Sequence, residues 1–260
     1  MESSLSNDCP HRKLLFHYRN GLFPVAYFLL FFPSRALFEN YRLALALGFF
    51  IALAGQLIRA LTIGLEYIVR GGRNRQVYAD KLVQGGVFAH CRNPLYLGNY
   101  LILLGVGVAA NSVLFLCVAI PFFTLAYWAI IAAEENYLRN KFGMEFDEYC
   151  LKVNRIIPRC AGFGQTLRGM QFNWQRIVTK EYGSVFIWPS AVILVALKNL
   201  WMKGQYDPRR TDVRMLWGSF VLLGLAYVTA RFLKKKRLLD DSGATKSLLK
   251  STGSTITKNV

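Results

Sequence analysis

Long apolar runs alternate with short polar, basic stretches along this chain. A membrane-spanning helix needs about 20 mostly apolar residues, and the run Leu43–Ile63 has that length. The block Leu95–Ala133 is too long for one crossing, and Ala110-Asn111-Ser112 near its middle favours a turn. We therefore expect a helical hairpin there, and an all-α polytopic membrane bundle of about six spans in total. The predicted spans are Leu22–Phe38, Leu43–Ile63, the two arms of Leu95–Ala133, Val185–Trp201 and Leu216–Leu233.

A different pattern follows the hairpin. Between Tyr137 and Pro158, apolar side chains recur at helical spacing with charged residues between them. This pattern is typical of amphipathic helices that lie along a membrane surface. Residues 161–180 are basic and mixed in character, and they favour no particular element.

Basic residues indicate the orientation, because Lys and Arg concentrate in the cytoplasmic loops of membrane proteins. Glu66–Lys81 and the run Lys234-Lys235-Lys236-Arg237 are both rich in them. Six crossings then place both termini in the cytoplasm, although basic residues between the last two spans count against this arrangement. We expect disordered cytoplasmic tails at 1–20 and 238–260, a membrane core over 21–160, and a basic connector with two further spans over 161–237.

The composition agrees with an integral membrane protein. Hydrophobic residues make up 53% of the chain and charged residues only 18%, below the roughly 25% of soluble domains. The net charge of +17 lies mostly beside apolar runs, so we attribute it to topology and anionic lipid headgroups. No recognised nucleic-acid-binding motif is present. The five cysteines show no paired spacing, which predicts neither a metal site nor a disulfide framework.

Candidate chemistry is concentrated in residues 82–98, the 82–98 segment, where glycines, aromatic residues and charged side chains meet at the start of the hairpin. Tyr96 falls one helical turn after Arg92, on the same face. The hairpin returns Glu134 and Glu135 to the same depth. Neighbouring side chains on a helix differ by about 100° in direction, so one carboxylate can face a pocket while the other pairs with an arginine. The sequence therefore predicts one site built from both stretches.

Two polar residues, Gln56 and Arg59, stand near the end of the second predicted span. For Arg59 two interpretations stay open. Its side chain could reach out to the membrane interface, or it could face a cavity inside the bundle.

The 82–98 segment and Glu134-Glu135, with the amphipathic stretch after them, resemble the isoprenylcysteine carboxyl methyltransferase and phospholipid methyltransferase family of integral-membrane enzymes. The family pattern is Gly-x-Tyr/Phe, Arg-His-Pro-x-Tyr-x-Gly, a helical hairpin, Glu-Glu, and a Phe-Gly-x-Glu-Tyr-x-x-Tyr type segment ending in Pro. Here Asn93 replaces the usual histidine before proline, as also occurs in the phospholipid methyltransferase branch, and His90 stands at a variable position. The resemblance covers about Gly55–Pro158 and is carried by the 82–98 segment, Glu134-Glu135, Leu138, Phe142-Gly143, Phe146, Tyr149 and Pro158.

The resemblance implies an S-adenosylmethionine-dependent methyltransferase whose acceptor is a lipid or isoprenoid-linked carboxylate or amine. It also implies a cofactor site on the cytoplasmic side of the bundle, closed over by the amphipathic segment. Arg92 suits the cofactor carboxylate through its planar guanidinium, and Glu134 or Glu135 suits the cationic end. We predict Arg92 and Glu135 as catalytic residues. The predicted cofactor-binding set is Gly86, Phe88, His90, Arg92, Asn93, Pro94, Tyr96, Gly98, Glu134 and Glu135.

Two alternatives stay open. Tyr149-Cys150 and Arg155-Ile156-Ile157-Pro158 also resemble a run in the NADPH-dependent membrane sterol reductases. Adjacent glutamates, and a chain short for the larger reductase bundle, favour the methyltransferase. The second alternative is a non-catalytic membrane protein that binds lipid, motivated by Asn93 in place of histidine. The oligomeric state and the role of the last two spans are left open.

Overall fold

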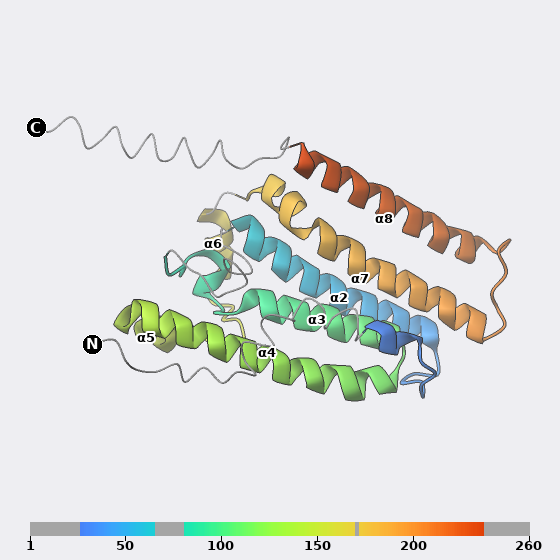
Figure 1. The fold of residues 1–260 in the computed structure, drawn as a ribbon, viewed down its shortest axis with the longest axis horizontal. Coiled ribbons are helices and arrows are strands. Elements are labelled where there is room, and N and C mark those ends of the chain that lie inside the picture. The colour runs from blue at the N-terminus through green and yellow to red at the C-terminus, as the bar shows by residue number, and fades with distance from the viewer. Residues whose placement is uncertain (1–26, 66–80, 170–171, 237–260) are drawn as a thin grey trace, which may run out of the picture.

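The computed structural model describes residues 27–65, 81–169 and 172–236. Within these ranges the chain forms an elongated bundle of helices without a β-strand (Figure 1), which confirms the predicted all-α class. The predictions for the two tails and for the basic stretch 66–80 lie outside the described residues. The long helices are α2 (Tyr41–Leu65), α3 (Pro94–Ala109), α4 (Val113–Phe142), α7 (Trp174–Met202) and α8 (Thr211–Lys235).

Four of the described helices, α2, α4, α7 and α8, are long and apolar enough to cross a membrane. Helix α3 is also apolar but has only 16 residues. These five helices correspond to the last five predicted spans. The first, Leu22–Phe38, is helical in its described part only as far as Phe31, the last residue of η1 (Leu29–Phe31), so its predicted end at Phe38 is wrong. The physical reason is Pro33, because a residue that precedes proline is driven out of the helical region, and Phe32 is extended.

The helical hairpin is confirmed. Asn111 turns the chain with a φ of 53°, a left-handed conformation that asparagine tolerates. The Ser112 side chain then caps α4 by accepting a hydrogen bond from the Phe115 amide at 3.2 Å. The returning arm does not end at the glutamate pair as predicted. It continues to Phe142, and Gly143 leaves the helix with a φ of 55°, so Glu134 and Glu135 lie inside α4.

Small residues bring α2 and α3 into backbone contact. A Cβ added to Gly105 would lie 2.4 Å from the Ala52 nitrogen and 2.5 Å from the Gly48 carbonyl oxygen. Small residues permit such close packing between membrane helices, where lipid removes the usual hydrophobic drive for association. Gly107 leaves room for the Phe115 ring of α4, because a Cβ added to Gly107 would lie 2.6 Å from Phe115 Cδ1. The α2–α3 seam therefore fixes α3, and with it the start of the hairpin.

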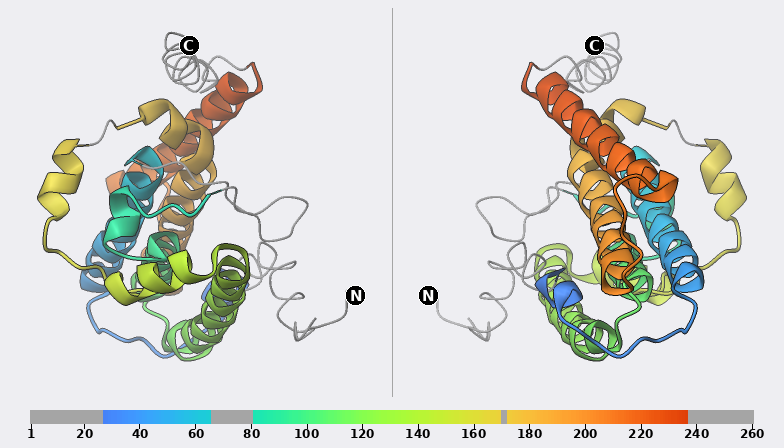
Figure 2. Two further views of the ribbon diagram at one scale, coloured as in Figure 1. Left: turned by 90° about the vertical axis from the view of Figure 1, so that its left-hand side faces the viewer. Right: turned by 90° about the vertical axis from the view of Figure 1, so that its right-hand side faces the viewer.

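Shorter elements gather at one end of the bundle: η2 (Gly86–Ala89), α5 (Met144–Lys152) and α6 (Phe163–Gly169) (Figures 1 and 2). Helix α5 confirms the predicted amphipathic character, because Phe146 and Tyr149 are buried while the charged Asp147 and Glu148 are exposed. Helix α7 also begins at this end. It starts at Trp174, well before the predicted Val185, because the Asn173 side chain caps it by accepting from the Arg176 amide at 2.9 Å.

Candidate functional site

The 82–98 segment lies at the end of the bundle where α5 and α6 gather (Figure 1). Gly86 starts η2 with a φ of 60°, a left-handed conformation that glycine adopts without strain. After η2 the chain turns into α3, whose first residue is Pro94. Proline suits this position because its missing N–H would have no partner within the helix. Asn93 and Tyr96 thereby reach the glutamates of α4.

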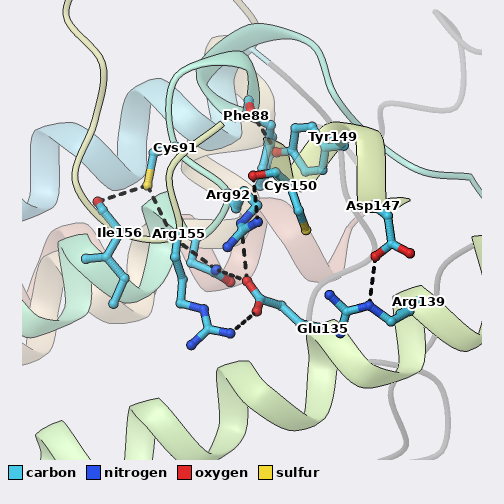
Figure 3. Close-up of polar contacts among 11 residues, drawn as sticks. Phe88, Cys91, Arg92, Glu135, Arg139, Asp147, Tyr149, Cys150, Arg155 and Ile156 are labelled. Atoms are coloured by element: carbon cyan, nitrogen blue, oxygen red, sulfur yellow. Dashed lines mark hydrogen bonds and ion pairs between the residues drawn. The ribbon is translucent and has the colours of Figure 1, made fainter. Parts of the chain in front are cut away.

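Glu135 is the centre of a charged cluster (Figure 3). Its side chain is buried. One carboxylate oxygen, Oε2, pairs with Arg155 Nη2. The other, Oε1, lies 3.3 Å from Arg92 Nε and accepts a hydrogen bond from Asn93 Nδ2 at 3.4 Å. Two guanidinium groups thus surround one carboxylate, which leaves the immediate surroundings of Glu135 positively charged and suited to an anionic ligand group.

Glu134 has a different partner. The Tyr96 hydroxyl donates to Glu134 Oε1 at 2.7 Å, and the Tyr96 ring lies 5.5 Å from the ring of Tyr127. The two adjacent carboxylates therefore have different contacts, as their different directions on the helix predict. One is held between arginines, and the other is held by a tyrosine of α3.

Residues 153–159 form a strap across the 82–98 segment. The Arg92 amide donates to the Asn154 carbonyl at 2.9 Å, and the Arg159 amide donates to the His90 carbonyl at the same distance. Because both bonds are between main-chain groups, the strap holds its path independently of the side chains it carries. The strap carries Arg155, whose guanidinium group is the second one in contact with Glu135.

His90 fixes the strap and α6 to the 82–98 segment. Its ring nitrogen Nδ1 lies 2.7 Å from the Arg159 carbonyl oxygen, and Nε2 lies 2.8 Å from the Thr166 hydroxyl. The ring also meets Phe163 edge to face, with 5.1 Å between centroids. These contacts give His90 a structural role at the rim of the site.

Two other predicted positions also have structural contacts of their own. The Phe88 carbonyl accepts a hydrogen bond from the Tyr149 hydroxyl at 2.7 Å, which ties η2 to α5. Gly98 lies against α2, where a Cβ would be 2.5 Å from Arg59 Cγ. That these positions, with Gly86 and Pro94, contact a cofactor stays a prediction.

Two residues of this end of the bundle were missed as site residues. Arg155 belongs to the amphipathic stretch and to the run that resembles the sterol reductases, but neither pattern predicts its pair with Glu135; an arginine in an apolar run just before a proline is an available signal. Glu181 was not singled out at all. It pairs with Arg59 at 2.7 Å, with both side chains buried. Arg59 therefore faces the bundle interior, and the interpretation that its side chain reaches the membrane interface is wrong.

Burial keeps the Cys91 thiol, at the edge of the site, protonated. Cys91 is fully buried, and its Sγ donates to the Ile156 carbonyl at 3.1 Å. Burial raises the pKa of the Cys91 thiol to about 11, and burial likewise raises the pKa of the Tyr149 hydroxyl. Cys91 is therefore a neutral thiol at physiological pH.

We expect Cys91 to resist alkylation in the folded protein. The thiolate is the reactive form, and a pKa of about 11 leaves only about one thiol in a thousand ionised at pH 8. In a variant that retains Cys91 as the sole cysteine, maleimide labelling at pH 8, followed by mass spectrometry, should be at least about a hundredfold slower than after denaturation. Equal rates in the two states would contradict the buried position.

The chain shows similarity to known proteins mainly over α2 to α5. Residues 43–145 match the phospholipid methyltransferase family model. A probable protein-S-isoprenylcysteine O-methyltransferase of Oryza sativa subsp. indica is 31% identical over 140 residues, which cover 50% of this chain and 67% of the rice protein. No solved structure shows a significant match.

Two bacterial proteins are also similar. A cobalt-zinc-cadmium resistance protein of Cupriavidus metallidurans is 34% identical over 113 residues, covering 44% of this chain and 47% of that protein. A nickel-cobalt-cadmium resistance protein of Alcaligenes xylosoxydans is 32% identical over 85 residues, covering 33% of this chain and 39% of that protein. The chain thus spans less than half the length of these two relatives.

Proposed function

This chain belongs to the family of integral-membrane methyltransferases that includes the phospholipid and isoprenylcysteine carboxyl methyltransferases, and on that basis we propose that it transfers a methyl group from S-adenosylmethionine to a lipid or isoprenoid-linked acceptor. The observation that carries the proposal is the Glu135 cluster beside the Glu134–Tyr96 pair. S-adenosylmethionine carries a carboxylate, an ammonium and a sulfonium, so its site needs groups of both charges. The cluster and the pair offer both within one end of the bundle.

Arg92 has a feature that fits such a ligand. Its Nε is buried and has no hydrogen-bond partner among the described residues, although Glu135 Oε1 lies nearby. A buried donor without an acceptor costs about 1–3 kcal/mol. A ligand carboxylate that supplied the acceptor would relieve this cost, and a guanidinium matches carboxylate geometry through two parallel hydrogen bonds.

We assign roles to the residues on this basis. When bound, S-adenosylmethionine supplies an electrophilic methyl group on a sulfonium. Arg92 binds its carboxylate, Glu134 faces its cationic end with Tyr96 keeping that carboxylate in place, and Glu135 orients the two arginines. If the acceptor is an amine, Glu135 accepts its proton, whereas a carboxylate acceptor needs no base. The strap and α5 exclude water from the reacting groups.

We also propose that the site faces the cytoplasm, together with both termini. Lys234 and Lys235 end α8 at the same end of the bundle as the site (Figure 1), and basic residues beside membrane spans mark the cytoplasmic side. The methyltransferase core is then residues 21–160, which include the matched residues 43–145. Residues 161–237 add a connector and two further spans.

A binding experiment tests this function. The purified protein in nanodiscs is titrated with S-adenosylmethionine, S-adenosylhomocysteine and NADPH, with Arg92→Ala as the comparison. We expect both adenosyl compounds to bind, and to bind Arg92→Ala at least about tenfold more weakly. Binding of NADPH alone would instead support the reductase alternative. Binding of none of the three would support the non-catalytic alternative.

The acceptor class is decided by a second assay. The protein is incubated with a methyl-labelled donor and either a phospholipid extract or a farnesylated cysteine analogue. Label in a base-labile ester indicates a carboxylate acceptor, and base-stable label in the phospholipid fraction indicates an amine.

A further inference from the structure

Three helices meet at a buried carboxylate inside the bundle. Glu181 of α7 is completely buried. Arg59 of α2 donates to it twice, from Nη2 to Oε1 at 2.7 Å and from Nε to Oε2 at 2.8 Å. Gln56, one turn earlier on α2, donates to Oε2 at 3.1 Å. Helices α2, α3 and α7 run side by side at this point (Figure 1).

Gln56 links α2 to α7 a second time. Its Oε1 accepts hydrogen bonds from Ser184 Oγ at 3.0 Å and from Trp188 Nε1 at 3.2 Å. Polar and charged groups inside a membrane bundle are costly unless they are paired, and an ion pair away from water is stable only while both partners are present. The geometry of α7 against α2 is therefore specified by these contacts rather than by apolar packing alone.

Arg59 also connects α2 and α7 to α3 through a hydrogen bond. Its Nη1 donates to Asn99 Oδ1. Gly98 makes room for the Arg59 stem, because a Cβ there would lie 2.5 Å from Arg59 Cγ. Asn99 falls one helical turn after Tyr96, on the same face, and Tyr96 is the residue that binds Glu134. A continuous set of contacts thus runs from α7 to the site.

We propose that Glu181 is a positioning residue for the site: from α7 it orients Arg59, which fixes the first turns of α3 and with them Tyr96 and the 82–98 segment. Helix α7 lies outside the matched residues 43–145, so this assigns a role to a span that the family match does not include. What the positioned site does rests on the proposed function, but the way in which α3 is held does not.

Two variants separate positioning from simple stabilisation. Glu181→Ala leaves the Arg59 charge buried and unpaired, so it lowers stability as well as order. The double variant Arg59→Met/Glu181→Met removes both charges, and apolar residues often replace a buried ion pair at little cost in stability. The double variant still lacks the Arg59–Asn99 contact. Asp212→Asn serves as the control, because it breaks the half-exposed Arg210–Asp212 pair at the start of α8.

The experiment measures three quantities for each variant: the thermal unfolding midpoint, the maleimide labelling rate of Cys91 as the sole cysteine, and the affinity for S-adenosylmethionine. For the double variant we expect an unfolding midpoint near that of the unsubstituted protein. We also expect labelling at least about tenfold faster and binding about tenfold weaker, the lower end of the roughly 10–100-fold loss that follows removal of a group orienting the ligands of a metal site. The control should match the unsubstituted protein in all three measurements.

Recovery of the original labelling rate and affinity in the double variant would overturn the inference, because Glu181 would then matter only for stability. So would unchanged labelling in Glu181→Ala. The two proposals can fail separately. If the unsubstituted protein binds no S-adenosylmethionine but Cys91 is still labelled faster in the double variant than in the unsubstituted protein and the control, the proposed function fails and the positioning role of Glu181 stands.

Discussion

Glu135→Gln is expected to lower methyl-transfer turnover by roughly a hundredfold or more while the protein still folds. The glutamine keeps the shape of the side chain but removes the charge that Arg155 and Arg92 share. Removing one preorganised polar group from an active site costs about 2.7–4 kcal/mol of transition-state stabilisation, which is roughly a hundredfold to a thousandfold in turnover. Turnover is measured with methyl-labelled S-adenosylmethionine, and folding by the unfolding midpoint.

Two further glutamate-to-glutamine variants serve as comparisons, one with a smaller expected loss of turnover and one with none. Glu134→Gln should lose only about tenfold in turnover at saturating S-adenosylmethionine, because the Tyr96 hydroxyl that donates to Glu134 can donate to an amide oxygen as well. Glu148→Gln should keep full activity, because Glu148 is exposed on α5 and its ion pair with Lys152 is long, at 4.0 Å, and exposed. Turnover of Glu135→Gln at the level of Glu148→Gln would remove Glu135 from the catalytic machinery.

The parts of the site that depend on local spacing could be predicted from the sequence. Asn111 with its neighbours marks the turn of the hairpin, and a hairpin necessarily returns Glu134 and Glu135 to the depth of the 82–98 segment. The different directions of adjacent side chains on a helix then predict different partners for the two glutamates. The structure shows these different partners.

The parts that depend on contacts between distant residues could not be predicted. The sequence shows two polar residues, Gln56 and Arg59, in an apolar span, but it does not show which side chain will meet Arg59, and Glu181 lies far along the chain on another helix. Helix ends were misplaced for a related reason. Capping by the Asn173 side chain extends α7 into a basic stretch, and the low apolar content there hides the helix from a search for apolar runs.

A substitution at Gly105 tests most directly whether α3 packs against α2 at backbone distance. In Gly105→Ala the added methyl group itself would lie 2.4 Å from the Ala52 nitrogen of α2, so backbone must move. We expect a loss of about 2–3 kcal/mol in stability, at the upper end of overpacking costs, measured by denaturation in mixed micelles. The loss should be accompanied by faster labelling of Cys91, because moving α3 away from α2 also moves the 82–98 segment.

Gly224→Ala on α8 is the matched control, since nothing lies within 4 Å of the position that its Cβ would take. There the same substitution should be neutral or stabilising by up to about 1 kcal/mol, because alanine favours a helix over glycine by that amount. The two substitutions are chemically identical and both lie within apolar helices, so their opposite signs isolate the α2–α3 contact. Equal effects at the two positions would mean that α3 does not approach α2 at backbone distance, and the link from Glu181 through Arg59 to α3 would lose its geometric basis.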